Sequence, residues 1–168
     1  MLSTQTVTSD TLQVVIFSLE NATTKKNEEY GIPIEQIKEI RTLDAITRVP
    51  NTVSHIKGIV NLRGMIIPVV DVKMMLGFSN ETVNTDQTRI LVAEVNDSLV
   101  GLLVDDVDRV MRLPKENVEP APRGTIDTNQ FVQGIAKTDD NLLVLIDVEK
   151  LMSSESSNFK DLKSKTMP

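Results

Sequence analysis

The chain has 168 residues with a formal net charge of −6 at pH 7, and 40% of its residues are hydrophobic but only 3% aromatic; this suffices for one compact domain or two small subdomains that share a core. The acidic balance argues against nucleic acid and anionic membrane as partners, and no stretch reaches the ~20 apolar residues of a membrane-spanning helix. Because the chain contains no cysteine and shows no secretory signal, we expect a cytoplasmic protein without disulfides, thiolate metal sites or a cysteine nucleophile.

The first part of the chain is predicted to form short strands. Residues 1–11 are rich in Ser and Thr, and we expect them to be a flexible lead-in. Apolar and β-branched residues predict strands over 12–19 and 30–34, and the polar residues 20–29 between them predict a solvated turn. Pro33 cannot donate a hydrogen bond to a neighbouring strand, so the second strand is expected at a sheet edge or a bulge.

The pattern of apolar residues then changes. They recur at every third position, at Ile34, Ile37, Ile40 and Leu43. This spacing indicates a helical turn or a strongly bent strand. Further on, Asn51 is a candidate N-cap for a short helix that ends near Gly58. An apolar strand that stops at Asp71 follows, and residues 72–76 are expected to add one helical turn.

The second half of the chain repeats the first. A Gly-Ile pair at Gly58 precedes an Asp-Val pair at Asp71, and the same pairs recur at the same distance from Gly134 to Asp147. The two copies span about residues 12–76 and 88–152, and the Ser- and Lys-rich residues 153–168 are expected to be a flexible tail. Four or five short strands in each copy predict a mainly β protein of two small pseudo-symmetric barrels with a groove between them. The sequence leaves open whether the copies exchange strands.

No catalytic constellation accompanies this scaffold. The single histidine, His55, has no cysteine or second histidine with which to form a common zinc site. Three aspartates lie within 105–108, but adjacent residues of an extended chain point to opposite sides, and the first copy does not preserve them. Asp71 and Asp147 are preserved in both copies, and each is expected to cap the helical turn after its strand. We therefore predict a protein that is not an enzyme, with no catalytic residues, no metal and no cofactor.

The turn Asn61-Leu62-Arg63-Gly64 occurs only once, because the second copy carries Asp139 at the position of Arg63. Arg63 has two interpretations. It is either a solvated turn residue or a recognition residue whose rigid fork of donors binds a partner's carboxylates. The sequence pattern leaves both open.

Several runs of the chain resemble the CheW family. The most specific is Asn-Leu-Arg-Gly-x-x-x-Pro-x-x-Asp, which begins at Asn61. The other similar runs are Tyr30 to Ile34, Ile37 to Arg41, Thr47 to Asn51, Ile56 to Val60, Val100 to Val107 and Leu142 to Leu151. Together they cover about residues 12–152 in one order.

This resemblance implies a non-enzymatic chemotaxis adaptor that joins the cytoplasmic tips of transmembrane chemoreceptors to the regulatory domain of the histidine kinase CheA. It implies two five-stranded Src-homology-3-like barrels with a few short helices, and a cytoplasmic location at receptor arrays through protein contacts alone. The family's receptor-binding groove lies between the barrels. In this sequence the matching residues for receptor or kinase binding are Ile34, Ile37, Glu39, Arg63 and Val107.

Two rival functions remain at this point. One is a β-barrel enzyme or small-ligand carrier that uses the same groove, and the other is an adaptor of the same fold in a different receptor–kinase pathway, such as pilus-based surface motility. The sequence also departs from the family pattern twice. The turn at 20–29 is longer than usual, and Arg89 stands where the family often has an apolar residue.

Overall fold

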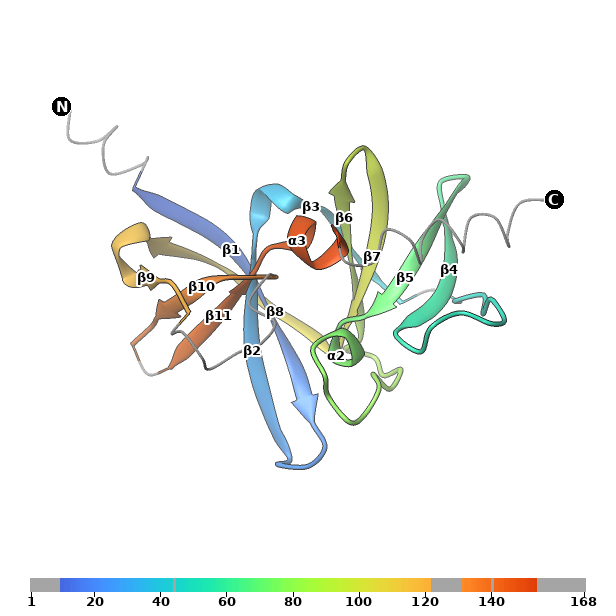
Figure 1. Cartoon of the computed structure of the whole chain (residues 1–168), viewed down its shortest axis with the longest axis horizontal. Helices are drawn as coiled ribbons and strands as arrows, with labels where there is room; N and C mark the ends of the chain where they lie inside the picture. The colour runs from blue at the N-terminus through green and yellow to red at the C-terminus, as the bar shows by residue number, and fades with distance from the viewer. Residues whose placement is uncertain (1–9, 44, 122–130, 140, 154–168) are drawn as a thin grey trace.

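The computed structural model describes residues 10–43, 45–121, 131–139 and 141–153, which form two sheets and a few short helical segments (Figure 1). The six-stranded sheet has the order β8-β1-β2-β11-β10-β9, with β1 (Thr11–Asn21), β2 (Lys26–Pro33), β8 (Asp106–Pro114), β9 (Val118–Glu119), β10 (Val132–Lys137) and β11 (Leu142–Ile146). The five-stranded sheet has the order β3-β6-β7-β5-β4, with β3 (Ile37–Thr42), β4 (Ile56–Leu62), β5 (Met65–Asp71), β6 (Arg89–Val95) and β7 (Ser98–Val104). The helical segments are the 3-10 turns η1 (Ile34–Gln36) and η2 (Lys115–Asn117) and the α-helices α2 (Val72–Met75) and α3 (Val148–Ser153).

Each sheet combines strands from both copies of the repeat. The hairpin β1–β2 pairs with strands of the second copy, and β2 lies parallel to β11 where Tyr30 faces Val144. The hairpin β6–β7 pairs with strands of the first copy, and β7 lies parallel to β5 where Gly101 faces Val69. Both sheets therefore have the same order of equivalent strands, which confirms the mainly β, pseudo-symmetric fold. The copies exchange their first hairpins.

Two predictions about the first hairpin are wrong. β1 continues to Asn21 and β2 begins at Lys26, so the turn is much shorter than residues 20–29. Polar side chains do not prevent the pairing, because both faces of the outer part of a hairpin can meet solvent while the backbones still bond. β2 also lies inside its sheet and not at an edge. Pro33 is tolerated there because it is the last residue of the strand, just before η1.

The helix predicted after Asn51 does not form. The segment before β4 consists of turns, and the strand begins at Ile56. Asn51 has a φ of 60°, a left-handed conformation that asparagine tolerates and that differs from the extended backbone of an N-cap. The stretch from Ile34 is a 3-10 turn followed by β3, as expected for a strongly bent strand. The helical turn expected over 72–76 is confirmed as α2.

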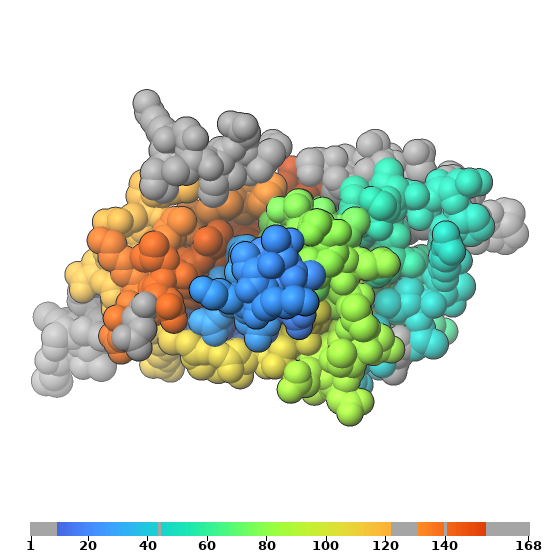
Figure 2. Space-filling view, turned by 90° about the horizontal axis from the view of Figure 1, so that it is seen from below, coloured from blue at the N-terminus to red at the C-terminus, as the bar shows by residue number. Residues whose placement is uncertain are grey.

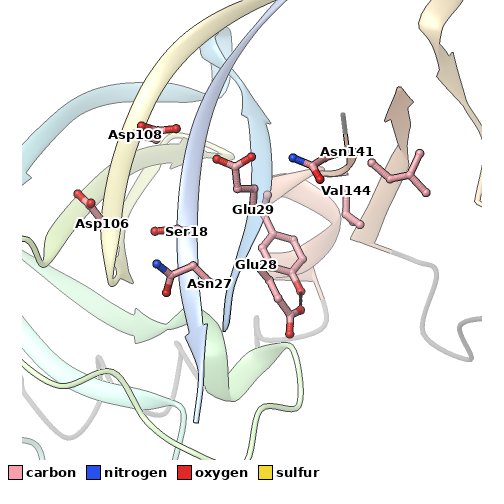
Figure 3. A pocket seen from close by; sticks show the side chains of 10 residues that line it. Ser18, Asn27, Glu28, Glu29, Asp106, Asp108, Asn141 and Val144 are labelled. Atoms are coloured by element: carbon pink, nitrogen blue, oxygen red, sulfur yellow. Dashed lines mark hydrogen bonds between the residues drawn. The ribbon is translucent and has the colours of Figure 1, made fainter. Parts of the chain in front are cut away.

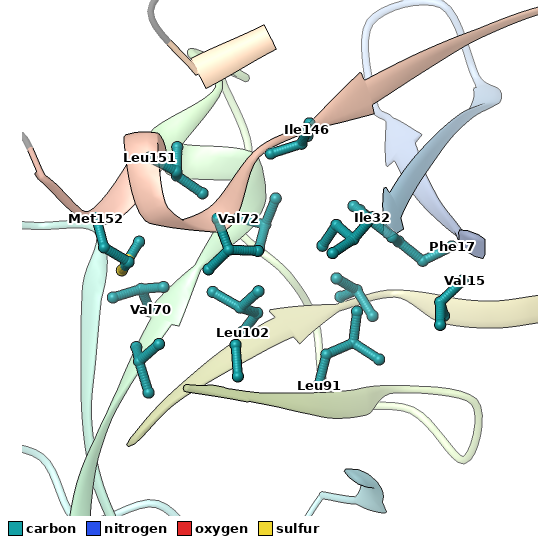
Figure 4. Packing of buried hydrophobic residues seen from close by; sticks show 14 of the residues in the cluster. Val15, Phe17, Ile32, Val70, Val72, Leu91, Leu102, Ile146, Leu151 and Met152 are labelled. Carbon is teal, nitrogen blue, oxygen red and sulfur yellow. The ribbon is translucent and has the colours of Figure 1, made fainter. Parts of the chain in front are cut away.

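The main hydrophobic core lies between the two sheets. Its side chains come from both (Figure 4), and they include Val15, Phe17, Ile32, Val70, Val72, Leu91, Leu102, Ile146, Leu151 and Met152. The Phe17 ring stacks on Tyr30 with its centroid 5.9 Å away. Each sheet also encloses a smaller cluster, one around Ile16 and Leu145 and one around Ile67 and Ile90. β1 is therefore buried on both faces, since alternate residues of a strand point to opposite sides.

The two aspartates that the repeat preserves both cap helices, as predicted. Asp71 is fully buried, and its carboxylate accepts hydrogen bonds from the Lys73 N–H (3.1 Å) and from the N–H and hydroxyl of Thr82 (both 2.8 Å). Asp147 is half-buried and accepts from the Glu149 N–H at 3.0 Å. Asp71 therefore also anchors the connection between α2 and β6, beyond its role as a cap.

We expect Asp71→Asn to lower the free energy of unfolding by about 2 kcal/mol, because an amide cannot accept at both positions and leaves buried donors unsatisfied. Asp147→Asn is the matched variant in the other copy and should cost less than about 0.5 kcal/mol, because asparagine caps a helix about as well as aspartate and the bonds to Asp147 are all accepted by one oxygen, Oδ1. Urea unfolding of both variants measures the difference. Equal losses would show that the Thr82 contacts add nothing to stability.

Candidate functional site

The β4–β5 turn directs Arg63 toward Glu39 on β3. Arg63 and Gly64 have φ values of 51° and 85°, as a two-residue hairpin turn of the type I′ class requires. The Asn61 side chain stabilises this turn by accepting a hydrogen bond from the Gly64 N–H at 2.8 Å. In this geometry Nη1 and Nη2 of Arg63 lie 2.8 and 3.3 Å from the two carboxylate oxygens of Glu39. Two of the predicted site residues therefore form an ion pair.

This ion pair joins the two outer strands of the five-stranded sheet. Glu39 belongs to β3 at one edge, and Arg63 follows β4 at the other. Nearby, Thr47 and Ile59 exchange two backbone hydrogen bonds of 2.8 Å between the chain after β3 and β4. These contacts connect the edges of the sheet and close it into a barrel. Arg63 thus has an internal partner, although 71% of its side chain is exposed.

Glu39 lies between two guanidinium groups, because Arg41 Nη1 also donates to it at 3.2 Å. Partial desolvation raises the pKa of the Glu39 carboxyl, but hydrogen bonds and charge from Arg41 and Arg63 outweigh it and hold the pKa below its usual range. A carboxylate with a lowered pKa stabilises the fold above its unfolded pKa, and that contribution is lost as the pH falls through the folded pKa.

We expect Arg63→Gln to raise the pKa of Glu39 toward the ordinary value of a glutamate, because one of its two cations is removed. A carbon-detected NMR titration of the Glu39 side chain measures the midpoint. Any stability difference between this variant and the natural protein should be present at neutral pH and vanish in acid, where Glu39 is protonated in both. An unchanged midpoint would contradict the pairing.

The three apolar residues of the predicted site are half-buried beside the central core. Ile34, Ile37 and Val107 all pack against the cluster between the sheets. Ile37 faces Ala93 on β6, and Val107 faces Phe17 on β1. The structure therefore divides the predicted site into an exposed ion pair at the closure of one sheet and three apolar side chains at the margin of the core.

An open groove of about 640 Å³ on the six-stranded sheet was missed by sequence reasoning (Figure 3). It is lined by Ser18, Asn27, Glu28, Glu29, Tyr30, Asp106, Asp108, Asn141, Leu142 and Val144. Burial, and then the hydrogen bond to Glu28 at 3.0 Å, raise the pKa of Tyr30, so its hydroxyl stays protonated and donates to that carboxylate. Arg109 contacts Glu29 and Asp108. The groove is strongly acidic, and only the pairing of β1 with both β2 and β8 brings its carboxylates together.

Arg89, the departure from the family pattern, folds back on its own loop. Its Nη1 donates to the backbone carbonyls of Asp86 and Thr88 at 2.7 and 2.9 Å. The guanidinium therefore helps to fix the end of the connection between α2 and β6. Across the residues that the structure describes, no helix is long and apolar enough to cross a membrane.

A family model described as the CheW-like domain matches residues 13–156. The chain belongs to the CheW-like family. It is 38% identical over 137 residues to the chemotaxis protein CheW of Klebsiella aerogenes, covering 80% of this chain and 81% of that protein. It is 35% identical over 131 residues to the chemotaxis protein CheW of Bacillus subtilis, covering 77% and 83%.

A solved structure shares the fold as well. The crystal structure of the scaffolding protein TtCheW from Thermoanaerobacter tengcongensis matches with a TM-score of 0.74 and 38% sequence identity, over 84% of this chain and 92% of that one. Membership in the CheW-like family makes this chain a chemotaxis adaptor and not an enzyme, as the sequence predicted. The names of the relatives do not favour the alternative role in pilus-based motility.

Proposed function

We propose that the protein couples transmembrane chemoreceptors to the histidine kinase CheA. One surface would hold the cytoplasmic tip of a receptor and another the regulatory domain of the kinase, so that the protein joins receptor arrays through protein contacts alone. The family match over residues 13–156 carries this proposal. Two sheets that pack on one central core support it, because they supply separate binding surfaces on a single body.

Receptor binding is assigned to Ile34, Ile37, Glu39, Arg63 and Val107. The guanidinium of Arg63 is exposed even while it contacts Glu39, so its remaining N–H donors are available to the carboxylates of a receptor helix. Met65, which follows the same turn, is 50% exposed and adds apolar area beside the charge. Apolar contacts would supply burial, and the ion pair would set the orientation of the partner.

Kinase binding is assigned to the ends of the barrels. Ile66 at the start of β5 and Leu142 at the start of β11 occupy equivalent positions in the two copies, and they are 63% and 67% exposed. Large apolar side chains exposed on hairpin ends are suited to a reversible protein contact. We expect each single contact to have a Kd of about 1 μM, strengthened by avidity in an array.

Kinase autophosphorylation in receptor-containing membranes tests the coupling function. The purified protein should make kinase activity depend on the receptors, and omission of the protein should abolish that dependence. Heat-denatured protein serves as the control. If adding the protein leaves kinase activity unchanged in the presence of receptors, the proposal fails.

A further inference from the structure

Lys73 is a buried lysine at the boundary between the two sheets. It belongs to α2, which follows the five-stranded sheet, and only 3% of its side chain is exposed. Its ammonium lies 2.9 Å from Asp105 Oδ2 and 3.1 Å from the carbonyl oxygen of Glu20. Glu20 belongs to β1 in the six-stranded sheet, and Asp105 lies in the link from β7 to β8. A buried ammonium requires such partners, because leaving it unpaired is costly.

Further hydrogen bonds reinforce this contact. Asp105 Oδ2 also accepts from the Glu20 N–H at 2.7 Å. Asn80, in the connection after α2, donates to the Glu20 carbonyl and accepts from the Ala22 N–H, both at 3.3 Å. The blue β1–β2 hairpin accordingly lies directly against the green segment in Figure 2. The hairpin of one sheet is thus fixed to α2 and the loop of the other.

The other connection between the sheets, from β2 to β3, is held at an equivalent place by hydrogen bonds of a neutral side chain. Gln36 lies in η1, which joins β2 to β3. Its amide donates to Asp147 Oδ1 at 3.1 Å and accepts from the Val148 N–H at 2.9 Å, at the start of α3. Both connections that cross between the sheets therefore bond to the start of a helix. The β2–β3 connection bonds to α3 through the neutral amide of Gln36, and the β7–β8 connection bonds to α2 through the buried ion pair of Asp105 with Lys73.

We propose that Lys73 and Asp105 are positioning residues that fix the orientation of the two sheets relative to each other, and that coupling requires this fixed orientation. This inference rests on the proposed function. Directional, hydrogen-bonded contacts specify one geometry where apolar surfaces alone allow sliding. Asp105 lies two residues before Val107, whereas Glu39 and Arg63 belong to the five-stranded sheet. Without the ion pair, the two sheets are free to change their relative orientation, while the side chains that contact receptor and kinase keep their places on each sheet.

Lys73→Met removes the charge and keeps a long apolar side chain. Lys57→Met is the matched control, because Lys57 pairs with Asp71 at 3.8 Å and with Glu81, both outside the six-stranded sheet. The chain has no cysteine, so spin labels can be attached at the exposed positions Lys26→Cys and Ser98→Cys, one on each hairpin. We expect the width of the measured distance distribution to increase about twofold in Lys73→Met and to stay unchanged in Lys57→Met. An unchanged width in Lys73→Met overturns the proposal.

Binding and coupling are then measured separately on the same variants. In Lys73→Met, receptor-dependent kinase stimulation should fall about fivefold, while the affinities for receptor alone and for kinase alone change by less than about twofold. Lys73→Arg keeps the charge and should restore stimulation. Affinities that fall in parallel with stimulation would mean that Lys73 only supports folding, which contradicts a positioning role.

A second variant covers the case in which Lys73→Met does not fold. Lys73→Met/Asp105→Asn leaves no unpaired buried charge, so it should fold and still show the broad distance distribution. A narrow distribution in the folded double variant refutes the proposal. The spin-label measurement needs no partner. If the natural protein fails to stimulate the kinase, the proposed coupling function is wrong. The widths of the spin-label distance distributions still show whether Lys73 fixes the orientation of the sheets.

Discussion

Arg63→Asp is expected to reduce receptor-dependent kinase stimulation by about tenfold or more, as for an arginine at the centre of a protein interface. The variant replaces an exposed cation by an anion next to Glu39, so it opposes any acidic receptor helix. The fold should survive, because aspartate tolerates the left-handed backbone of the turn and the second copy carries Asp139 at this position. We expect the melting temperature to fall by less than about 3 °C, as for loss of a surface ion pair.

The other copy of the repeat supplies a control for this experiment. Arg109 and Asp139 stand there at the positions of Glu39 and Arg63, with the signs of charge reversed. The double variant Glu39→Arg/Arg63→Asp reverses both charges and so allows an ion pair to form again between the same two positions, although Arg109 itself pairs with Glu29 and Asp108. It should recover the melting temperature and leave coupling impaired. If it restores coupling, Arg63 acts by closing the barrel, and the assignment to receptor recognition is wrong.

Gly58→Ala is expected to lower the free energy of unfolding by about 3 kcal/mol or more. Gly58 has a φ of 149°, and a Cβ there would lie 2.1 Å from the carbonyl oxygen of Thr47. That oxygen accepts the Ile59 N–H in the contact that joins the edges of the five-stranded sheet. A methyl group must displace this backbone, so we expect the midpoint of urea unfolding to fall sharply.

Alanine substitutions at two other glycines distinguish destabilisation by a left-handed backbone from destabilisation by steric overlap of the new Cβ. Gly64→Ala has a φ of 85° but no atom within 4 Å of the new Cβ, so it should cost about 1 kcal/mol. Gly134→Ala, at the equivalent position of the second copy, would place a Cβ 2.9 Å from the Glu119 carbonyl oxygen. Its cost should lie between the other two. If Gly58→Ala costs no more than Gly64→Ala, the contact between Thr47 and Ile59 is too loose to close the barrel.

Local patterns predicted the local parts of this structure well. The strand around Val15 follows from an apolar, β-branched run, and the strand around Leu91 follows from the repeat of the first half in the second. The caps at Asp71 and Asp147 follow from their repetition in both copies. The short helix after Asn51 failed because an N-cap residue type is also a left-handed turn residue, and the sequence does not distinguish these two backbones.

The candidate site was predicted only as separate residues. The family resemblance selected both Glu39 and Arg63, but their ion pair depends on the two edges of one sheet meeting. The acidic groove does not follow from the sequence, because the pattern predicts a solvated turn around Glu28 and treats Asp108 separately from it, and only the position of β1 between β2 and β8 brings the two together. The pairing of strands depends on the whole chain, so the pattern of apolar residues within one segment cannot predict which strands become neighbours.

Because the two copies exchange their first hairpins, the two sheets cannot be completed at the same stage of protein synthesis. The strands of the five-stranded sheet are contiguous from 37 to 104, whereas the six-stranded sheet joins β1 and β2 to strands that are translated last. While β11 is still inside the ribosome, the nascent hairpin β1–β2 lacks the neighbours that cover both of its outer edges. β1, which is buried on both faces, is thus the first of the described strands to be made and among the last to be completed, so the growing chain carries an apolar surface for chaperones to shield.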